Sequence, residues 1–382
     1  MTAYHKNMNT YYDNATTSYP KPAAMREALA HFYDEPVGSY GRSHDRATLR
    51  VVAEIEELRD VVASLLGVAE PSHICFCDNA TTGLNAILRG VLQEGDTVLV
   101  SPMEHNAVMR PLHFLSETRG VRVEVMPALP DGRVDTQRLA AAIPTACALA
   151  VVNLQSNVNG IIQPIAEISR ILKQRGVRIL ADATQCLGSM RLQTDAWNID
   201  YLAFTGHKGL LGPSGTGGFY MRRPLDVSPL TLGGNGLHSS LLSMGTEMPE
   251  RFMAGTANVL GLTALLAAVR HLPSYRLSHD EWQDYLLRMR ELSGLRVYSS
   301  SDGTAQGFLC SLTHERLSPA ELSDALYHGH GIITRAGLHC APLAHETIGT
   351  AATGTTRISL SPYHTAKDLD HLLEALRDVV RR

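Results

Sequence analysis

The chain has 382 residues, 44% of them hydrophobic and 19% charged, and a formal net charge of −4 at pH 7. This composition is typical of a globular protein with a sizeable core, and the length suits one large domain plus a smaller one, or two medium ones. A net charge this close to zero gives no reason to expect nucleic acid or an anionic membrane surface as a partner. The first twenty residues are polar, no run of about eighteen apolar residues occurs, and the six cysteines do not form a disulfide framework in so long a chain. We therefore expect a cytoplasmic protein with reduced thiols.

In chain order, an irregular N-terminal segment through residue 20 is followed by two predicted helices. Apolar side chains recur at helical spacing in residues 25–34 and again in residues 44–67, where Gly67 closes the pattern. Strand-like runs then alternate with helix-like segments. Strands are expected at 73–78, 96–102, 121–129, 147–156, 177–185, 200–207 and 215–223, and helices at 82–92, 107–120, 134–143 and 165–176. This alternation predicts a mostly parallel sheet covered by helices on both faces.

The pattern changes after about residue 255. Helices are predicted at 257–272, 280–292 and 367–381, and short strands at 307–315, 331–337 and 354–363. Such a mixture favours a second, smaller α+β domain. We therefore expect a large domain over residues 20–255 and a small domain formed by residues 1–19 together with 256–382.

Polar side chains follow the ends of successive predicted strands. In open α/β sheets, ligands bind beyond the carboxyl ends of the strands. A helix that begins there with two threonines offers free backbone N–H groups to a phosphate. The polar residues at these positions are Thr81, Thr82, His105, Asn157, Asp182, Gln185, Thr205, His207 and Lys208.

Each of these residues taken alone has an ordinary explanation, as a helix cap, a loop histidine or a surface lysine. Their occurrence at successive strand ends favours a shared ligand. A phosphate cradle, an aromatic ring, a carboxylate and a lysine are the groups needed to hold pyridoxal 5′-phosphate. Lys208 would form the Schiff base, because desolvation lowers the pKa of a lysine and frees its amine to attack. Asp182 would pair with the protonated pyridine nitrogen.

Motifs along the whole chain resemble those of class-V aminotransferases and, more narrowly, of cysteine desulfurases. The cofactor core is Asp182-x-x-Gln185, followed by Thr205-Gly206-His207-Lys208 and the glycine-rich GPSGTGG. Further matches are DNATTSYPKP (13–22), EHNAVMRP (104–111), QSNVNG (155–160), FMAGTANV (252–259), RAGLHCAPLAH (335–345) and GTTRISL (354–360). The resemblance implies an α/β protein with the PLP-dependent transferase fold type I, in which a mostly parallel large domain carries a smaller α+β C-terminal domain.

The same resemblance implies a role for each matching residue. Lys208 would carry the cofactor and move the substrate's Cα proton, and His105 would stack on the cofactor ring and assist that transfer. Asp182 would face the pyridine nitrogen, and Gln185 the ring's phenolic oxygen. The cofactor phosphate would be bound by residues of the helix start and the lysine loop, Thr81, Thr82, Thr205 and His207, and by Thr256 across a homodimer interface. Arg357 and Arg335 would bind the substrate carboxylate, and Asn157 would lie near both the cofactor ring and that carboxylate. No metal site is expected.

Cys340 is the residue that selects a reaction. It lies in RAGLHCAPLAH, where the desulfurase family keeps its catalytic cysteine, and Arg335 and His339 could support a thiolate there. The alternative, an inert buried thiol, is the interpretation we adopt for Cys310, in GFLCSL. The resemblance therefore implies a PLP-dependent cysteine desulfurase, which converts L-cysteine to L-alanine and leaves the sulfur on Cys340 as a persulfide.

Other outcomes stay open at the level of sequence. The enzyme could be a selenocysteine lyase acting on L-selenocysteine, a C–S lyase releasing sulfide, or an aminotransferase of the same fold, and a sulfur-acceptor protein is a possible partner. A nicotinamide dehydrogenase is disfavoured, because the glycines at 212–218 precede a strand rather than a helix. Two departures from the family pattern are DNATTSY in place of DNAATT and a hydroxyl at Thr184, where the family commonly has a smaller residue.

Overall fold

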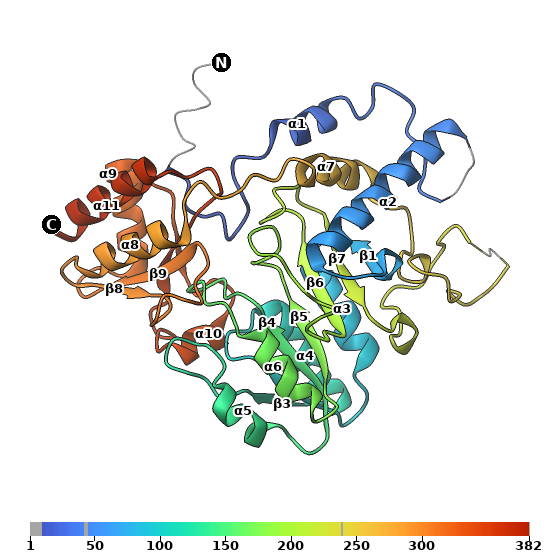
Figure 1. Cartoon of the computed structure of the whole chain (residues 1–382), viewed down its shortest axis with the longest axis horizontal. Coiled ribbons are helices and arrows are strands. Elements are labelled where there is room, and N and C mark those ends of the chain that lie inside the picture. Colours follow the sequence, from blue (N-terminus) through green and yellow to red (C-terminus); the bar gives the residue numbers. More distant parts are fainter. Residues whose placement is uncertain (1–9, 42–44, 238–239, 382) are drawn as a thin grey trace.

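The computed structural model describes residues 10–41, 45–237 and 240–381 (Figure 1). These residues form a large sheet covered by helices and a smaller antiparallel sheet with helices of its own. The predicted α/β fold is confirmed. Residues 1–9, which we assigned to the small domain, lie outside the described residues.

The first two predicted helices are present, although the first begins and ends a few residues earlier than the predicted range 25–34. Helix α1 spans Ala23–Ala30, and α2 spans Arg46–Leu66. The carboxylate of the N-cap residue Asp45 accepts hydrogen bonds from two backbone N–H groups of the first turn of α2. At the other end, Gly67 has φ 67°, and an added Cβ would lie 2.5 Å from the carbonyl oxygen of Leu192. Only glycine fits this helix end without strain.

The large sheet has the strand order β1-β7-β6-β5-β4-β2-β3. Its strands are β1 (Ile74–Cys77), β2 (Thr97–Val100), β3 (Arg122–Val125), β4 (Cys147–Asn153), β5 (Arg178–Asp182), β6 (Tyr201–Thr205) and β7 (Gly217–Met221). The pairs β3–β2, β2–β4, β4–β5 and β5–β6 are parallel, whereas β7 is antiparallel to both β6 and β1. The sheet is therefore mostly parallel, as predicted.

Helices cover both faces of this sheet. Successive residues of β4 alternate between two apolar clusters, with Val151 in the cluster that includes α3 (Ala80–Val91) and α4 (Asn106–Arg119). Val152 belongs to the opposite cluster, which includes α2, α6 (Ile165–Lys173) and α7 (Val259–Val269). Burial on both faces explains why these strands are almost continuously apolar. The short helix α5 spans Thr136–Ala142.

The smaller sheet has the strand order β10-β11-β9-β8 and an apolar core of its own around the buried Trp282. Its strands are β8 (Leu295–Tyr298), β9 (Leu309–His314), β10 (Arg335–Gly337) and β11 (Thr355–Ser359). Its helices are α8 (His279–Arg290), α9 (Pro319–His330), α10 (Pro342–Thr347) and α11 (Ala366–Arg381). The elements β8, α9 and α10 were not predicted from the sequence.

The packing suggests a refinement of the predicted domain division. Helix α7 packs on α1 and α2, and its apolar side chains belong to the core of the large sheet. Figure 1 shows the three helices together, away from the small sheet. At the N-terminal end, Tyr11 pairs with Ile333 and Asp13 pairs with Ser359, so this segment lies along the small sheet. We therefore propose that the domain boundary follows Val269 rather than residue 255.

Within the described residues, no helix combines the length and the apolar character needed to span a membrane.

Candidate active site

A cavity lies beyond the carboxyl ends of the parallel strands β4, β5 and β6. The open space between its walls is about 470 Å³, including the part that faces solvent. The lining residues are Asn79, Ala80, Thr81, His105, Ala107, Asn153, Asn157, Asp182, Thr184, Gln185, Thr205, His207 and Lys208. The structure thus brings together most of the predicted cofactor-binding residues. The exceptions are Thr82 and Thr256, which line a neighbouring cavity beside it.

Lys208 follows strand β6 in a turn, and its environment favours a free amine. Removal of water, together with the positive charge of Arg357, lowers its pKa to about 8, whereas Asp182 opposes the shift. An amine with this pKa is partly uncharged near neutral pH. It can therefore attack an aldehyde far more readily than a surface lysine.

Asp182 ends strand β5 and is 4% exposed. Its Oδ1 atom accepts a hydrogen bond of 2.9 Å from the backbone N–H of Thr184. Burial raises the pKa of the carboxyl group, and this rise is opposed by Thr184 and by the charge of Lys208. A buried carboxylate in this position would gain strongly from a cationic partner such as a protonated ring nitrogen.

His105 is the N-cap residue of α4, and its orientation is fixed by the helix. Its Nδ1 atom accepts a hydrogen bond of 3.0 Å from the backbone N–H of Ala107. The neutral ring must then carry its proton on Nε2. Burial lowers the pKa of His105 to about 4, assisted by the positive charges of Lys208 and Arg335. The ring is therefore neutral near pH 7.

The start of helix α3 supplies the anion-binding end of the cavity. Asn79 caps the helix by accepting a hydrogen bond of 3.0 Å from the N–H of Thr82. The helix start can approach strand β7 closely because residue 217 is glycine, where a Cβ would lie 2.7 Å from the Cα of Asn79. His207 also lines the cavity, and burial lowers its pKa to about 4. These features suit a phosphate at the helix N-terminus.

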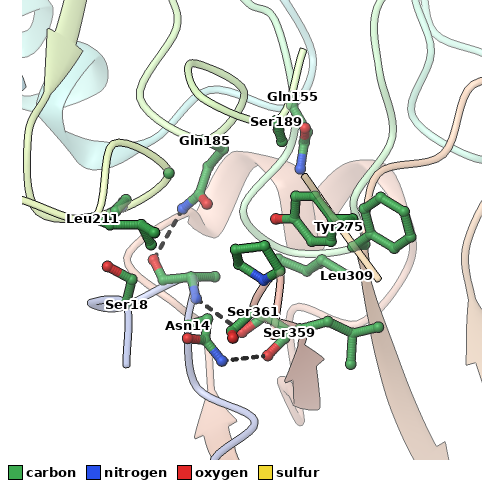
Figure 2. Close-up of a pocket in the computed structure, with 16 residues that line it drawn as sticks. Asn14, Ser18, Gln155, Gln185, Ser189, Leu211, Tyr275, Leu309, Ser359 and Ser361 are labelled. Atoms are coloured by element: carbon green, nitrogen blue, oxygen red, sulfur yellow. Dashed lines mark hydrogen bonds between the residues drawn. The ribbon is translucent and has the colours of Figure 1, made fainter. Parts of the chain in front are cut away.

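Lys208 and Gln185 also line a second cavity, which lies between the two sheets (Figure 2). Its other walls are mainly neutral polar groups and an aromatic pair, Tyr275 stacked on Phe308 with ring centres 4.1 Å apart. The Gln185 side chain donates a hydrogen bond of 3.0 Å to the carbonyl oxygen of Ala15. Gln185 therefore connects the cofactor cavity to the N-terminal segment.

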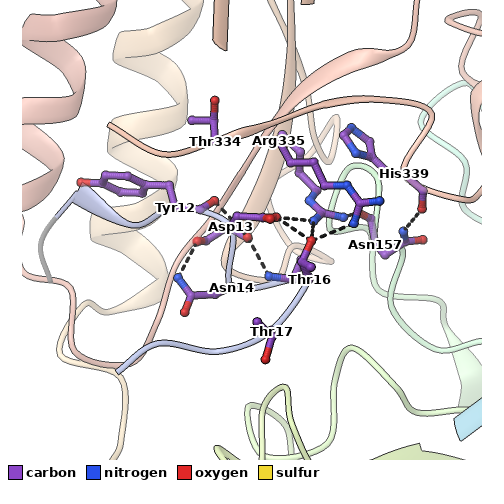
Figure 3. Close-up of polar contacts among 12 residues, drawn as sticks. Tyr12, Asp13, Asn14, Thr16, Thr17, Asn157, Thr334, Arg335 and His339 are labelled. Carbon is purple, nitrogen blue, oxygen red and sulfur yellow. Dashed lines mark hydrogen bonds and ion pairs between the residues drawn. The ribbon is translucent and has the colours of Figure 1, made fainter. Parts of the chain in front are cut away.

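Arg335 and Arg357 lie directly opposite each other on the paired strands β10 and β11. Neither is among the lining residues of the cavity around Lys208. Arg357 is 1% exposed and forms an ion pair of 2.6 Å with Asp13, while its Nη1 donates to the carbonyl oxygen of Asn157 at 3.0 Å (Figure 3). Its Nε atom has no hydrogen-bond partner. The predicted clamp on the substrate carboxylate is thus already held by a carboxylate of the chain.

Cys340 lies in the turn between β10 and α10 and is exposed. Both His339 and Cys340 have positive φ angles, 49° and 57°, and the Cys340 carbonyl oxygen accepts a hydrogen bond of 2.8 Å from the N–H of Asn106. The Nη2 atom of Arg335 lies 3.9 Å from the Cys340 sulfur. Cys340 also lines a surface hollow that shares His105 with the cofactor cavity. By contrast, Cys310 is buried, and burial raises its pKa to about 12.

Sequence reasoning missed three polar residues near these groups. Asp13 and Thr16 lie in the quoted DNATT motif but received no role. Glu104 precedes His105 and is fully buried, with its Oε1 accepting hydrogen bonds from Ser101 at 2.6 Å and from the N–H of Asn153 at 2.8 Å. Burial raises the pKa of Glu104 to about 8. An acidic residue beside a predicted active-site histidine was the available signal.

Buried atoms without partners test whether the cavity fits pyridoxal phosphate. The Thr184 hydroxyl, Nδ1 of His207 and Oδ1 of Asn157 are each buried and have no hydrogen-bond partner in the described structure. All three residues line the cavity. Buried polar groups are rarely left unpaired in folded proteins, so these atoms indicate a polar ligand. Within the described residues, no cluster of metal-binding side chains occurs.

Comparison with known proteins identifies the family. The chain belongs to the class-V aminotransferases, whose family model matches residues 10–372. A probable cysteine desulfurase of Xylella fastidiosa is 31% identical, over 97% of this chain and 90% of that protein, and the cysteine desulfurase CsdA of Escherichia coli is 30% identical over 97% and 94%. The apo structure of a cysteine desulfurase from Thermococcus onnurineus superposes with a TM-score of 0.89 at 27% identity, over 97% of this chain and 94% of that one.

These findings confirm the predicted family and its fold type. They also confirm pyridoxal 5′-phosphate as the cofactor, because the family depends on it. The roles of the individual site residues remain predictions.

Proposed function

We propose that this protein is a PLP-dependent cysteine desulfurase that converts L-cysteine to L-alanine and takes up the sulfur as a persulfide on Cys340. The observation that carries the proposal is the placement of Cys340. Its exposed thiol sits beside Arg335, in a hollow that shares His105 with the cavity around Lys208. An aminotransferase of this fold would have no use for such a thiol.

The residues around the cavity would hold the cofactor by their complementary charges. Lys208 would bind its aldehyde carbon, Asp182 would pair with the ring nitrogen, and the start of α3 would bind the phosphate together with Thr205 and His207. The bound cofactor supplies an electron sink that makes the substrate's Cα proton removable. The contribution expected of Thr256 would come from a partner subunit.

Lys208 would move the proton, and His105 would assist by hydrogen bonding. The Lys208 amine, whose pKa is lowered to about 8, is partly uncharged near neutral pH and would accept the Cα proton in that form. His105 keeps its Nε2 proton, since its Nδ1 is occupied by the N–H of Ala107. We propose that His105 donates hydrogen bonds through Nε2 and is not itself a base near neutral pH.

Sulfur transfer falls to Cys340. The Cys340 thiolate would attack the sulfur of the substrate, forming an S–S bond while the substrate's Cβ–S bond breaks. The electron pair of the broken bond stays on the substrate carbon, which takes up a proton to give alanine. The sum is one cysteine and one enzyme thiol converted to one alanine and one enzyme persulfide, so no external oxidant is needed.

We also propose that the protein is a homodimer and that it passes its sulfur to an acceptor. Leu232, Leu241 and Leu242 are all more than half exposed, on the segment that leads to Thr256. Thr256 and Thr82 line the same outer cavity, which a second subunit could cover. The exposed position of Cys340 would let an acceptor protein or small thiol remove the sulfur. We also propose a cytoplasmic location, where such thiols are available.

The test is production of alanine and sulfide from L-cysteine with dithiothreitol, comparing the wild type with Cys340→Ala. We expect the wild type to release both products and the variant almost neither. Sulfide release by the variant would favour a C–S lyase. Activity on L-selenocysteine alone would favour a selenocysteine lyase. Transamination without sulfide would favour an aminotransferase.

A further inference from the structure

The side chain of Thr16 joins the two arginines of the active-site region (Figure 3). Its Oγ1 atom lies 2.8 Å from Nη1 of Arg335, 2.8 Å from Nη2 of Arg357 and 2.8 Å from Oδ1 of Asp13. A hydroxyl group has one proton to donate and two lone pairs to accept with. The Thr16 hydroxyl therefore uses its full capacity, by donating to Asp13 and accepting from both arginines.

The two arginines depend on Thr16 to different degrees. Arg357 is also held by its ion pair with Asp13 and by its bond to a backbone carbonyl. Arg335 forms no ion pair with a described carboxylate. Its guanidinium group donates hydrogen bonds to the hydroxyl of Thr16 and to the sulfur of Cys340. Loss of the Thr16 hydroxyl would thus release Arg335 while leaving Arg357 in place.

The guanidinium group of Arg335 lies between Thr16 and Cys340 and contacts both. One amino group is fixed by Thr16, and the other lies 3.9 Å from the Cys340 sulfur. Arg357 stands opposite Arg335 in the sheet and repels it, so without a tether the Arg335 side chain would tend to move away. A guanidinium without a carboxylate partner is well placed to stabilise a thiolate.

The backbone around Cys340 is fixed independently of Arg335. The Cys340 carbonyl oxygen is bonded to the N–H of Asn106, and the His339 carbonyl oxygen accepts a hydrogen bond of 2.7 Å from the side chain of Asn157. His339 also contacts Thr355 through Nε2, at 3.0 Å. A change at Thr16 should therefore act on the charge beside the sulfur and not on the path of the turn.

Other charged or titratable groups face Cys340 as well. The hollow that it lines also contains Arg89 from α3, and His105 and Arg110 from the start of α4. His339 precedes it in the turn, and the His345 ring of α10 lies 5.6 Å from the His339 ring. Within the described residues, Arg335 is the cation that hydrogen-bonds to the sulfur.

We propose that Thr16 is a positioning residue for sulfur transfer, because it fixes the guanidinium of Arg335 against the Cys340 sulfur and so stabilises the thiolate. This inference rests on the proposed role of Cys340 as the sulfur acceptor. It assigns a purpose to the hydroxyl in DNATTSY, the sequence departure noted above. A residue acting in this way should change the reactivity of Cys340 more than the affinity for substrate.

The test is the rate of Cys340 alkylation by iodoacetamide in the holoenzyme as a function of pH, followed by mass spectrometry of the Cys340 peptide. Thr16→Val removes the hydroxyl at nearly constant shape, and Thr16→Ser keeps it. We expect alkylation near pH 7 to slow about three- to tenfold in Thr16→Val, because the cation beside the sulfur is no longer held in place. Thr16→Ser should follow the wild type.

Two further variants make the result decisive. Thr334→Val is the matched control, because Thr334 precedes Arg335 but its hydroxyl bonds to Ser323. Thr16→Ala replaces Thr16→Val if the latter does not fold, as judged by circular dichroism and bound cofactor. The inference is overturned if the folded Thr16 variant has the wild-type profile, or if Thr334→Val shifts as far.

Alkylation requires no turnover, so this result is separate from the proposed function. If the protein does not act on L-cysteine but the profile shifts, the desulfurase proposal fails and the link between Thr16 and Cys340 stands. If L-cysteine is turned over, kcat of Thr16→Val should fall by a larger factor than KM rises, because Arg335 is released from Cys340 while Asp13 still holds Arg357. A large rise in KM with an unchanged alkylation profile would assign Thr16 to substrate binding instead.

Discussion

At the scale of single residues, the position of Lys208 accounts for most of the predicted chemistry. A lysine at the end of a buried strand loses its water, and its pKa falls to about 8. The same amine faces a buried carboxylate and a neutral histidine across one cavity. These three groups come from different strand ends and meet only because the strands are parallel.

Replacement of this lysine should abolish both cofactor retention and turnover. We expect Lys208→Ala to lose the visible absorption of covalently bound pyridoxal phosphate and to lower kcat by at least roughly 10²–10⁴-fold, the usual contribution of a positioned acid–base group. The measurement is the absorption spectrum after gel filtration, followed by the cysteine assay. Lys367→Ala, on the outer helix α11, is the control and should keep both. A Lys208→Ala protein that stays yellow through gel filtration would rule out this role.

The Thr184 hydroxyl should contribute to cofactor binding. It is buried, faces the cavity and has no hydrogen-bond partner, so burying it is costly unless the ligand completes the bond. We expect Thr184→Val to weaken pyridoxal phosphate binding about fivefold, corresponding to about 1 kcal/mol for one hydrogen bond. Titration of the apoenzyme with cofactor measures this directly, with Thr184→Ser as the conservative control. Equal or tighter binding by Thr184→Val would show that the hydroxyl does not face the ligand.

At the scale of elements, helix ends and turns fix where the functional groups lie. His105 caps α4, Asn79 caps α3 and the Cys340 turn is bonded to the first residue of α4. One helix start therefore holds both the histidine of the cofactor cavity and the turn that carries the thiol. This connection depends on contacts between segments more than 200 residues apart, and it cannot be read from sequence spacing.

Helix α9 should depend on its capping box for stability. Ser318 accepts a hydrogen bond from the N–H of Glu321, and the Glu321 carboxylate accepts one in return from the N–H of Ser318. We expect Ser318→Ala to lower the free energy of unfolding by about 1 kcal/mol. Urea unfolding measures the change, and Ser318→Asp, which can still cap the helix, should restore most of it. Wild-type stability in Ser318→Ala would mean that α9 is held by its packing alone.

Long, regular elements could be predicted from the sequence, and short or mixed ones could not. The continuous apolar strands and the amphipathic α2 appear where expected, because their patterns reflect burial. Strand β8 is only half-buried, and α9 and α10 carry too few apolar side chains for a clear period. The capping box of α9, Ser-x-x-Glu, was a usable signal that we did not apply.

Some residues of the candidate site could likewise be placed from the sequence, and others could not. Residues at strand ends could be placed together from the sequence, because parallel strands end at one edge. The bridge from Thr16 to Arg335 could not, since it joins residues 319 positions apart through a hydroxyl. Nor could the sequence show that Arg357 is already paired with Asp13, a contact between the N-terminal segment and the last strand.

At the scale of the whole molecule, the two cores meet around the N-terminal segment and the Cys340 turn. The N-terminal segment pairs with the small sheet, while its Ser18 N–H donates to the carbonyl oxygen of His207 in the large domain. The apolar cluster of Met103, Val158 and Ala344 joins the two sheets on the side of α10. Contacts from both cores therefore hold the active-site region.

Acid should destabilise the molecule through buried neutral histidines such as His364. Burial lowers its folded-state pKa to about 4, below the unfolded value of about 6.5. The unfolded chain therefore binds more protons between these values, and the free energy of unfolding falls as pH drops through that window, by at most about 1.4 kcal/mol per pH unit for this group.

The variant that tests this is His364→Asn, which keeps an acceptor for the Ser361 N–H but does not titrate. Thermal unfolding of the two proteins between pH 7.5 and pH 5 gives the measurement. We expect the Tm of the variant to fall less steeply with acid than that of the wild type. Parallel Tm curves would show that His364 does not contribute to the acid response.

The most direct test of the central claim is the mass of the protein after one turnover without reductant. The holoenzyme is mixed with a small excess of L-cysteine, and the Cys340 peptide is analysed by mass spectrometry, alongside the alanine released. Our account predicts that the Cys340 peptide gains one sulfur atom in the same molar amount as alanine, and that the buried cysteines gain none. Alanine formed without added sulfur on Cys340 would contradict it.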